Sequence, residues 1–257
     1  MKKLLFMVFA TALTVGCQNG DLEIIGNSGE GYIAINASTS GAVQTKAEAE
    51  AGITLDTPAV SDFSLLITGE ANGFSKSWNS ISDYKSEDER FVKGNYTVAI
   101  EYGNVTEEGY NKPYFYGEVV APVPDRNKTV DVEVVATVGN AIVEIATTEN
   151  FRGYFPTYEF KMKTATNEFE LVENNSEYLF IAPQANVTID CNCIRQSNLA
   201  TGKYEALPTQ TIPEVKARTR YIVTYDLERA GKVNVTVKLN DTIIGTHDID
   251  VELNENA

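Results

Sequence analysis

The stretch that decides the fold reads Thr129-Val130-Asp131-Val132-Glu133-Val134-Val135-Ala136-Thr137-Val138-Gly139-Asn140-Ala141-Ile142-Val143-Glu144-Ile145. Valine alternates with polar residues, so that Val130, Val132 and Val134 lie on one side of a strand. Gly139-Asn140 is a turn signal, after which the chain either pairs back or crosses to a second sheet. We therefore place a boundary between two domains at this point.

Short segments of the same kind recur on both sides of this boundary, separated by Gly, Asn and Pro. No long segment has a 3.6-residue period, and no glycine-rich phosphate loop follows a strand. A polar loop or a single helical turn is expected around Ile81–Tyr84. Ser86–Arg90 is expected to be a solvated charged loop, and residues 38–57 a long flexible connection. The expected strands are Tyr32–Asn36, Phe63–Thr68, Phe74–Trp78, Tyr96–Gly103, Tyr114–Glu118, Thr129–Val138, Ala141–Ile145, Tyr158–Met162, Glu168–Val172, Tyr178–Ala182, Val187–Ile194, Arg220–Leu227, Lys232–Leu239 and Thr246–Leu253.

The N-terminus has the layout of an export signal. Two lysines precede an apolar run from Leu4 to Val15, which is too short to span a bilayer as a helix, and Gly16-Cys17 follows. This resembles the lipobox of bacterial lipoproteins, in which the cysteine is diacylated. An ordinary secretory signal with an incidental cysteine is the alternative. The resemblance implies a lipid-anchored protein of the outer membrane, and the acidic residues behind Cys17 resemble signals for display on the cell surface.

The prediction is thus an all-β protein with two Ig-like β-sandwich domains in tandem after a signal peptide. The expected segments are the signal peptide 1–16, the lipidated N-terminus and tether 17–30, an N-terminal sandwich 31–139 and a C-terminal sandwich 140–257.

Composition argues against several functions. The net charge of −15 disfavours binding to nucleic acid. His247 is the only histidine, so a multi-histidine metal site is impossible and a catalytic triad has one candidate; an exposed strand histidine is favoured. Cys191 and Cys193 point to the same face of a strand, as buried thiols, a strained disulfide or half of a metal site, and we favour buried thiols. We expect no enzyme activity and no cofactor.

The order of motifs resembles the fimbrillin-like lipoproteins of Bacteroidota, and especially an uncharacterised domain family from gut Bacteroides. The resemblance covers most of the mature chain. The motifs that carry it are the lipobox, Tyr32-Ile33-Ala34-Ile35, the Thr45-Lys46-Ala47 linker, Gly94-Asn95-Tyr96-Thr97-Val98-Ala99, Pro113-Tyr114-Phe115-Tyr116-Gly117, and Asn140-Ala141-Ile142-Val143.

The resemblance implies a pair of transthyretin-like sandwiches that form, cap or anchor pilus-like fibres. In fimbrillins a protease cuts after a basic residue behind the first strand, and the vacated groove accepts a strand from the next subunit. Lys46 is the only basic residue between Lys3 and Lys76 and stands at the corresponding place; an ordinary linker lysine is the alternative. Asp241-Thr242-Ile243 resembles a short O-glycosylation motif of Bacteroidota, which makes Thr242 a candidate.

Two other functions compete with a fibre component whose partners are further fimbrial subunits. One is a carbohydrate-binding accessory lipoprotein that recognises host or bacterial surface glycans. Its sugar-stacking candidates are Trp78, Tyr84, Tyr110, Tyr114 and Tyr116, although core packing also explains such residues. The other is a hydrolase with paired carboxylates, which the single histidine and the lack of a nucleophile motif disfavour.

Overall fold

A computed structural model of the protein describes residues 30–45, 53–124, 127–229, 233–239 and 242–249. Its helical elements are α1 Glu149–Tyr154 and the 3-10 turns η1 Val60–Asp62, η2 Ile81–Asp83 and η3 Gln196–Asn198. The strands are β1 Glu30–Ser40, β2 Ala42–Thr45, β3 Ile53–Thr54, β4 Ser64–Gly69, β5 Ser75–Trp78, β6 Phe91–Val92, β7 Gly94–Tyr102, β8 Gly109–Tyr110, β9 Phe115–Val123, β10 Thr129–Val138, β11 Ala141–Thr147, β12 Thr157–Lys163, β13 Glu168–Leu171, β14 Leu179–Ile181, β15 Val187–Ile194, β16 Glu205–Ile212, β17 Thr219–Arg229, β18 Val233–Leu239 and β19 Thr242–Ile249.

The N-terminal half is built on one seven-stranded sheet in the order β5-β4-β7-β9-β10-β1-β6. Strands β4, β7, β9 and β10 pair antiparallel, whereas β1 runs parallel to β10. Alternate residues face inward because side chains of a strand alternate between faces. In β10, for example, Val132, Val134 and Ala136 are buried while Glu133 and Val135 are exposed.

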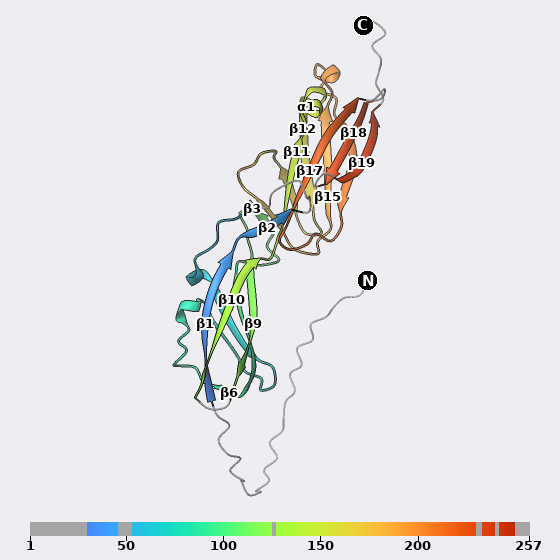
Figure 1. Ribbon diagram of the computed structural model, residues 1–257. Coiled ribbons are helices and arrows are strands. Elements are labelled where there is room, and N and C mark those ends of the chain that lie inside the picture. Colours follow the sequence, from blue (N-terminus) through green and yellow to red (C-terminus); the bar gives the residue numbers. More distant parts are fainter. Residues whose placement is uncertain (1–29, 46–52, 125–126, 230–232, 240–241, 250–257) are drawn as a thin grey trace.

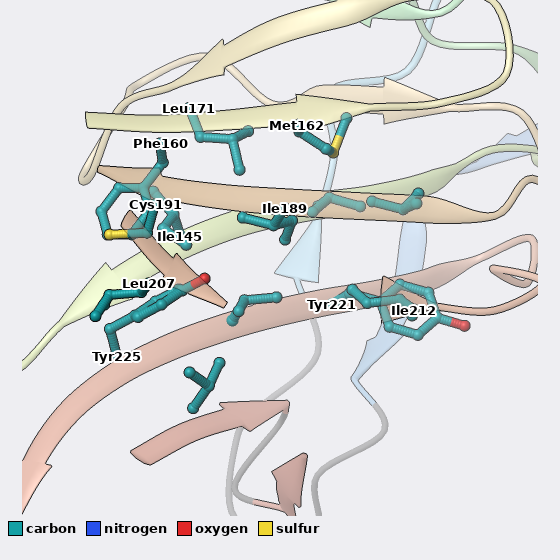
Figure 2. Packing of buried hydrophobic residues seen from close by; sticks show 14 of the residues in the cluster. Ile145, Phe160, Met162, Leu171, Ile189, Cys191, Leu207, Ile212, Tyr221 and Tyr225 are labelled. Carbon is teal, nitrogen blue, oxygen red and sulfur yellow. The ribbon is translucent and has the colours of Figure 1, made fainter. Parts of the chain in front are cut away.

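The C-terminal half is a sandwich of two sheets. An eight-stranded sheet has β19-β18-β17-β11-β14-β8 as its main path, and a four-stranded sheet has the order β13-β12-β15-β16. Figure 2 shows Phe160 and Cys191 of the smaller sheet packed against Ile145 and Tyr225 of the larger one. The Phe160 and Tyr225 ring centroids are 4.8 Å apart. The prediction of an all-β, sandwich-like protein is confirmed.

The two halves follow each other along the long axis of the molecule, and neighbouring strands cross between them (Figure 1). β10 continues through Gly139-Asn140 into β11, so the turn signal marks a crossing between sheets and not a reversal. The buried Asn140 fastens this crossing: its Oδ1 accepts from the Tyr114 N–H at 2.5 Å and its carbonyl oxygen accepts from the Arg218 N–H at 2.8 Å. Beside it, β1 continues into β2, which pairs with β17.

A third connection runs through the loop before β9. Its strand β8 pairs with β14 of the C-terminal half. Glu108, just before β8, accepts hydrogen bonds from Thr164 Oγ1 at 2.6 Å, Asn167 Nδ2 at 2.8 Å and the Ala182 N–H at 3.2 Å. The eight-stranded sheet of the C-terminal half therefore includes three strands from the N-terminal half, β2, β3 and β8. The domain limits 31–139 and 140–257 remain a prediction.

Most expected strands are present, and Val187–Ile194 has the predicted bounds. The long connection over residues 38–57 was wrong in part, because β1 extends to Ser40 and β2 and β3 follow. These residues form strands because they pair with β10 and β17, which are distant in sequence. The local pattern of apolar residues does not reveal such pairing. The final strand was placed four residues too late, since β19 begins at Thr242.

Strand β16 and helix α1 were missed. β16 contains Pro208, and its buried positions Leu207, Gln210 and Ile212 do not alternate strictly. α1 is a six-residue helix capped by Thr148, whose Oγ1 accepts from the Phe151 N–H at 3.3 Å. Both elements are defined by packing against the core, which a short sequence window does not show.

Cys191 and Cys193 are buried free thiols on the inner face of β15, which confirms the favoured interpretation. The Cys193 hydrogen bond, together with burial, raises the pKa of the Cys191 thiol, so that this thiol stays protonated. Replacing both residues by Ala should lower the free energy of unfolding by about 1–3 kcal/mol. Urea denaturation measures this, with the exposed Val172→Ala as a control that changes little. Stoichiometric zinc in the purified protein would contradict a packing role.

A second prediction concerns Glu173, which binds β11 and β12 together. It accepts from the Thr147 N–H and Oγ1, both at 2.8 Å, and from the Tyr158 hydroxyl at 3.0 Å. Burial raises the pKa of Glu173, but these hydrogen bonds and Arg152 outweigh it, so the net shift is downward from 4.5. The carboxylate therefore stabilises the fold at neutral pH, and this contribution is lost as the pH falls from 4.5 through the lowered folded-state pKa.

Glu173→Gln should accordingly flatten the loss of stability at acid pH, as followed by urea midpoints in an acid titration. The exposed Glu107→Gln is the matched control. Identical acid profiles for wild type and Glu173→Gln would rule out this source of pH dependence.

Candidate functional site

The first strand occupies an edge position along most of its length. Tyr32–Ser40 pairs in parallel with Thr129–Thr137 of β10. On the other side, β6 pairs only with Glu30 and Gly31, and no described strand pairs with the outer edge of Tyr32–Ser40. β1 can therefore leave the sheet when its ladder with β10 and its short pairing with β6 break. No other pair of strands has to separate.

The segment from Gly31 to Thr45 contains no charged residue. Three other described edge strands carry features that discourage edge pairing: Lys76 in β5, Glu168 and Glu170 in β13, and Glu205 and Pro208 in β16. The β1 edge lacks such protection. Its composition suits a strand that exchanges between pairing partners.

Few apolar side chains hold this segment. Ile33 is fully buried in the N-terminal core and Val43 is 2% exposed, while Ile35 and Ala37 are only partly buried. A fully buried aliphatic side chain contributes roughly 1.5–3 kcal/mol, so the two together contribute far less than a whole core strand such as β10.

The β1–β2 segment also belongs to the C-terminal half. Gln44 and Thr45 of β2 pair in parallel with Thr219 and Arg220 of β17, and the Gln44 N–H donates to the Arg218 carbonyl oxygen at 2.9 Å. Farther along β17, the same side is occupied by β18. One uncharged segment thus completes a sheet in each half.

A latch, defined as residues 84–92, covers the beginning of β1. The Tyr84 hydroxyl donates to the Ile33 carbonyl oxygen at 2.6 Å. Burial raises the pKa of Tyr84, with Glu89 and Glu87 adding to the shift, so the hydroxyl remains a donor at neutral pH. The Arg90 guanidinium lies 5.7 Å from the centroid of the Tyr32 ring and 3.5 Å from the Glu30 carboxylate.

The latch is itself tied to the opposite edge of the sheet. Glu89 forms an ion pair with Lys76, and the Tyr84 and Trp78 rings meet edge to face at 5.1 Å. Because β5 and β1 lie near opposite ends of the strand order, this contact closes the curled sheet. Most of Ser86–Arg90 is exposed, but the sequence did not predict its ion pairs with the two edges of the sheet. The apolar Phe91-Val92 after the charged residues was the sequence feature that indicated packing against the sheet.

The predicted modification sites are not brought together by the described structure. Cys17 and Lys46 lie outside the described residues, and Lys46 directly follows Thr45, the last residue of β2. Thr242 begins β19 and His247 lies within it, but their side chains are outside those that the structure describes. No group of three or more potential metal ligands occurs among the described residues.

The predicted sugar-stacking aromatics are largely used for internal contacts. Tyr84 is buried against β1, Trp78 packs on it, and the Tyr110 hydroxyl donates to the Glu170 carbonyl oxygen at 2.7 Å. Tyr114 and Tyr116 stack with centroids 6.3 Å apart, and their hydroxyls bond to Glu101 and Glu118. The five residues form no common site.

Among the described residues, no helix has the length and apolar character needed to cross a bilayer.

The latch should slow hydrogen exchange in β1. Removing the Tyr84 hydroxyl in Tyr84→Phe should speed hydrogen exchange of the peptide covering residues 30–40 about five-fold, since one buried hydrogen bond is worth about 1 kcal/mol. Mass spectrometry of exchanged peptides measures this. Tyr110→Phe is the matched control, because it removes an equivalent hydroxyl-to-carbonyl bond elsewhere. Equal effects of both variants on residues 30–40 would show that the latch does not hold β1.

Comparison with known proteins gives a family and a set of similar folds. No curated protein matches the chain. Among solved structures, the fimbrial anchor protein Mfa2 from Porphyromonas gingivalis is similar at 9% identity and a TM-score of 0.44, over 85% of this chain and 100% of that one.

A proposed cell adhesion protein from Bacteroides eggerthii matches at 9% identity and a TM-score of 0.41, over 87% of this chain and 98% of that one. A proposed polysaccharide-binding protein from Bacteroides thetaiotaomicron matches at 8% identity and 0.36, over 87% and 99%. None of these three is described as an enzyme. A family model matches residues 29–255, which confirms the resemblance to an uncharacterised domain family: the chain belongs to the family described as domain of unknown function (DUF4493).

Proposed function

We propose that this protein is a structural or adhesive component of pilus-like fibres on the bacterial surface, lipid-anchored through Cys17 in the outer membrane and without catalytic activity. The observation that carries the proposal is the β1–β2 segment. It is uncharged from Gly31 to Thr45, lies at an edge, completes a sheet in each half, and ends directly before Lys46.

Removal of this segment would create an acceptor for another strand. The outer edge of β10 would expose unpaired N–H and C=O groups along Thr129–Thr137, beside the apolar space left by Ile33. A strand of another subunit satisfies both needs by main-chain pairing and side-chain burial. Repeated from copy to copy, this heterologous contact does not close on itself and produces a fibre.

Carbohydrate binding by an accessory lipoprotein is the second candidate function. Its predicted aromatics do not converge, and Tyr84, Trp78 and Tyr110 have packing roles. The arrangement of β1–β2 therefore favours the fibre component.

Limited trypsin digestion tests the proposal, because Lys46 is the only trypsin site between residues 4 and 75. Cleavage should release the segment up to Lys46 and yield oligomers that survive dilution, detected by size-exclusion chromatography with light scattering. Lys46→Ala should stay intact there and remain monomeric.

Two further measurements show whether a negative result means that the segment was retained or that strand exchange did not occur. Intact-mass analysis shows whether the segment up to Lys46 has left, and added synthetic peptide 30–45 should compete with oligomer formation. A nicked protein that retains the segment and stays monomeric would overturn the strand-exchange role.

A further inference from the structure

The end of the molecule farthest from β6 carries a second feature, outside the β1–β2 segment. Figure 1 shows α1 and the turn at η3 at this end. Between α1 and the loop that joins β15 to β16 lies a hollow of about 350 Å³. The residues that line it are Tyr154, Arg195, Ser197, Asn198, Lys203, Tyr204 and Glu205.

The walls of this hollow, which we call the tip pocket, are preorganised. The Asn198 carbonyl oxygen accepts from the Thr201 N–H at 3.1 Å, the Thr201 hydroxyl at 2.9 Å and the Gly202 N–H at 3.0 Å. Gly202 has a φ of 63°, in the left-handed region, where any residue with a side chain would be strained. The loop therefore presents its next residues, Lys203 and Tyr204, in a fixed conformation.

The side chains of the tip pocket are of two kinds. Tyr204 is 54% exposed and Tyr154 is half-buried, so both side chains are partly accessible to solvent. Arg195 and Glu205 form a planar ion pair, with Arg195 Nη2 and Glu205 Oε1 at 2.7 Å, and their side chains are 16% and 32% exposed. Aromatic faces beside a planar charged pair provide both an apolar surface and directional hydrogen bonds.

Other polar groups around the tip pocket are available to a ligand. Within the described residues, the hydroxyls of Tyr154, Ser197 and Tyr204 and the ammonium group of Lys203 have no hydrogen-bond partner. Lys203 is also a cation without an ion-pair partner there, in a chain whose net charge is −15. The volume of the tip pocket falls within the roughly 300–1,000 Å³ range of ligand sites.

We propose that the tip pocket binds a pyranose unit of an oligosaccharide. A pyranose ring has one face of C–H groups, which suits Tyr204 or Tyr154, and a rim of hydroxyls, which suits the Arg195–Glu205 pair, Ser197 and Lys203. The net charge disfavours a polyanion. One lysine matches a single sugar carboxylate, so an acidic pyranose is bound in preference to its neutral counterpart.

This inference names a ligand for the adhesive part of the proposed function, and rests on that proposal only for a location at the cell surface. It does not require release of β1. Sugar binding without oligomer formation would support the tip-pocket proposal and contradict the fibre proposal. Oligomer formation without sugar binding would support the fibre proposal and contradict the tip-pocket proposal.

An oligosaccharide array, probed with the full chain purified in detergent, tests the tip pocket. The array holds neutral hexose and hexosamine chains together with their sialylated and uronate-containing counterparts. We expect binding to at least one acidic structure, followed by titration calorimetry on that oligosaccharide. Tyr204→Ala should weaken binding at least ten-fold, and Lys203→Ala should weaken binding of the acidic sugar more than that of the neutral one.

The controls distinguish the tip pocket from other surfaces. Tyr116→Ala removes a stacked tyrosine from the N-terminal sheet and should leave affinity unchanged. Because Tyr204 and Lys203 are exposed, both variants should keep the wild-type melting temperature, which circular dichroism checks. Absence of binding across the array would overturn the proposal, as would binding that Tyr116→Ala abolishes and Tyr204→Ala does not affect.

Discussion

The parallel pairing of β1 with β10 is the constraint on which the rest of the structure depends. Because the two strands run in the same direction and end together, at Ser40 and Val138, both leave the N-terminal sheet at the same place. The chain then continues twice into the C-terminal sheet, as β2 and as β11, on opposite sides of β17. Reversing β1 would leave β17 without its partner at Thr219 and Arg220.

Close packing at the crossing leaves little freedom there. A Cβ on Gly139 would lie 2.4 Å from the Tyr114 ring, and one on Gly41 would lie 2.1 Å from the Leu55 carbonyl oxygen. Both crossings therefore need a glycine, Gly41 between β1 and β2 and Gly139 between β10 and β11. Glu108 adds a contact from a third segment, so that the orientation of the halves is fixed by hydrogen bonds and not only by the covalent chain.

The sequence predicted the strands whose two faces differ in polarity. Val132 and Val134 in β10 and Val98 and Ile100 in β7 alternate with less buried residues, and the burial pattern follows them. It did not predict β2, because its partner β17 lies far along the chain. It did not predict β16, because this strand contains Pro208 and its buried positions do not alternate strictly. The edge composition of β1 could be read from the uncharged run before Lys46, whereas the latch required the position of Tyr84 relative to Ile33. The tip pocket depends on α1, which periodicity did not reveal.

The parallel β1–β10 ladder also determines how the molecule responds to pulling. Tension along the long axis, as shear flow exerts on a surface protein, loads the hydrogen bonds between Tyr32–Ser40 and Thr129–Thr137 side by side and in shear. Bonds loaded in this way resist together, and forced unfolding depends on the rate at which the whole ladder ruptures. While both crossings are covalently intact, each carries part of the load between the halves. After a cut behind β2, β10 and its continuation into β11 would carry the covalent part alone.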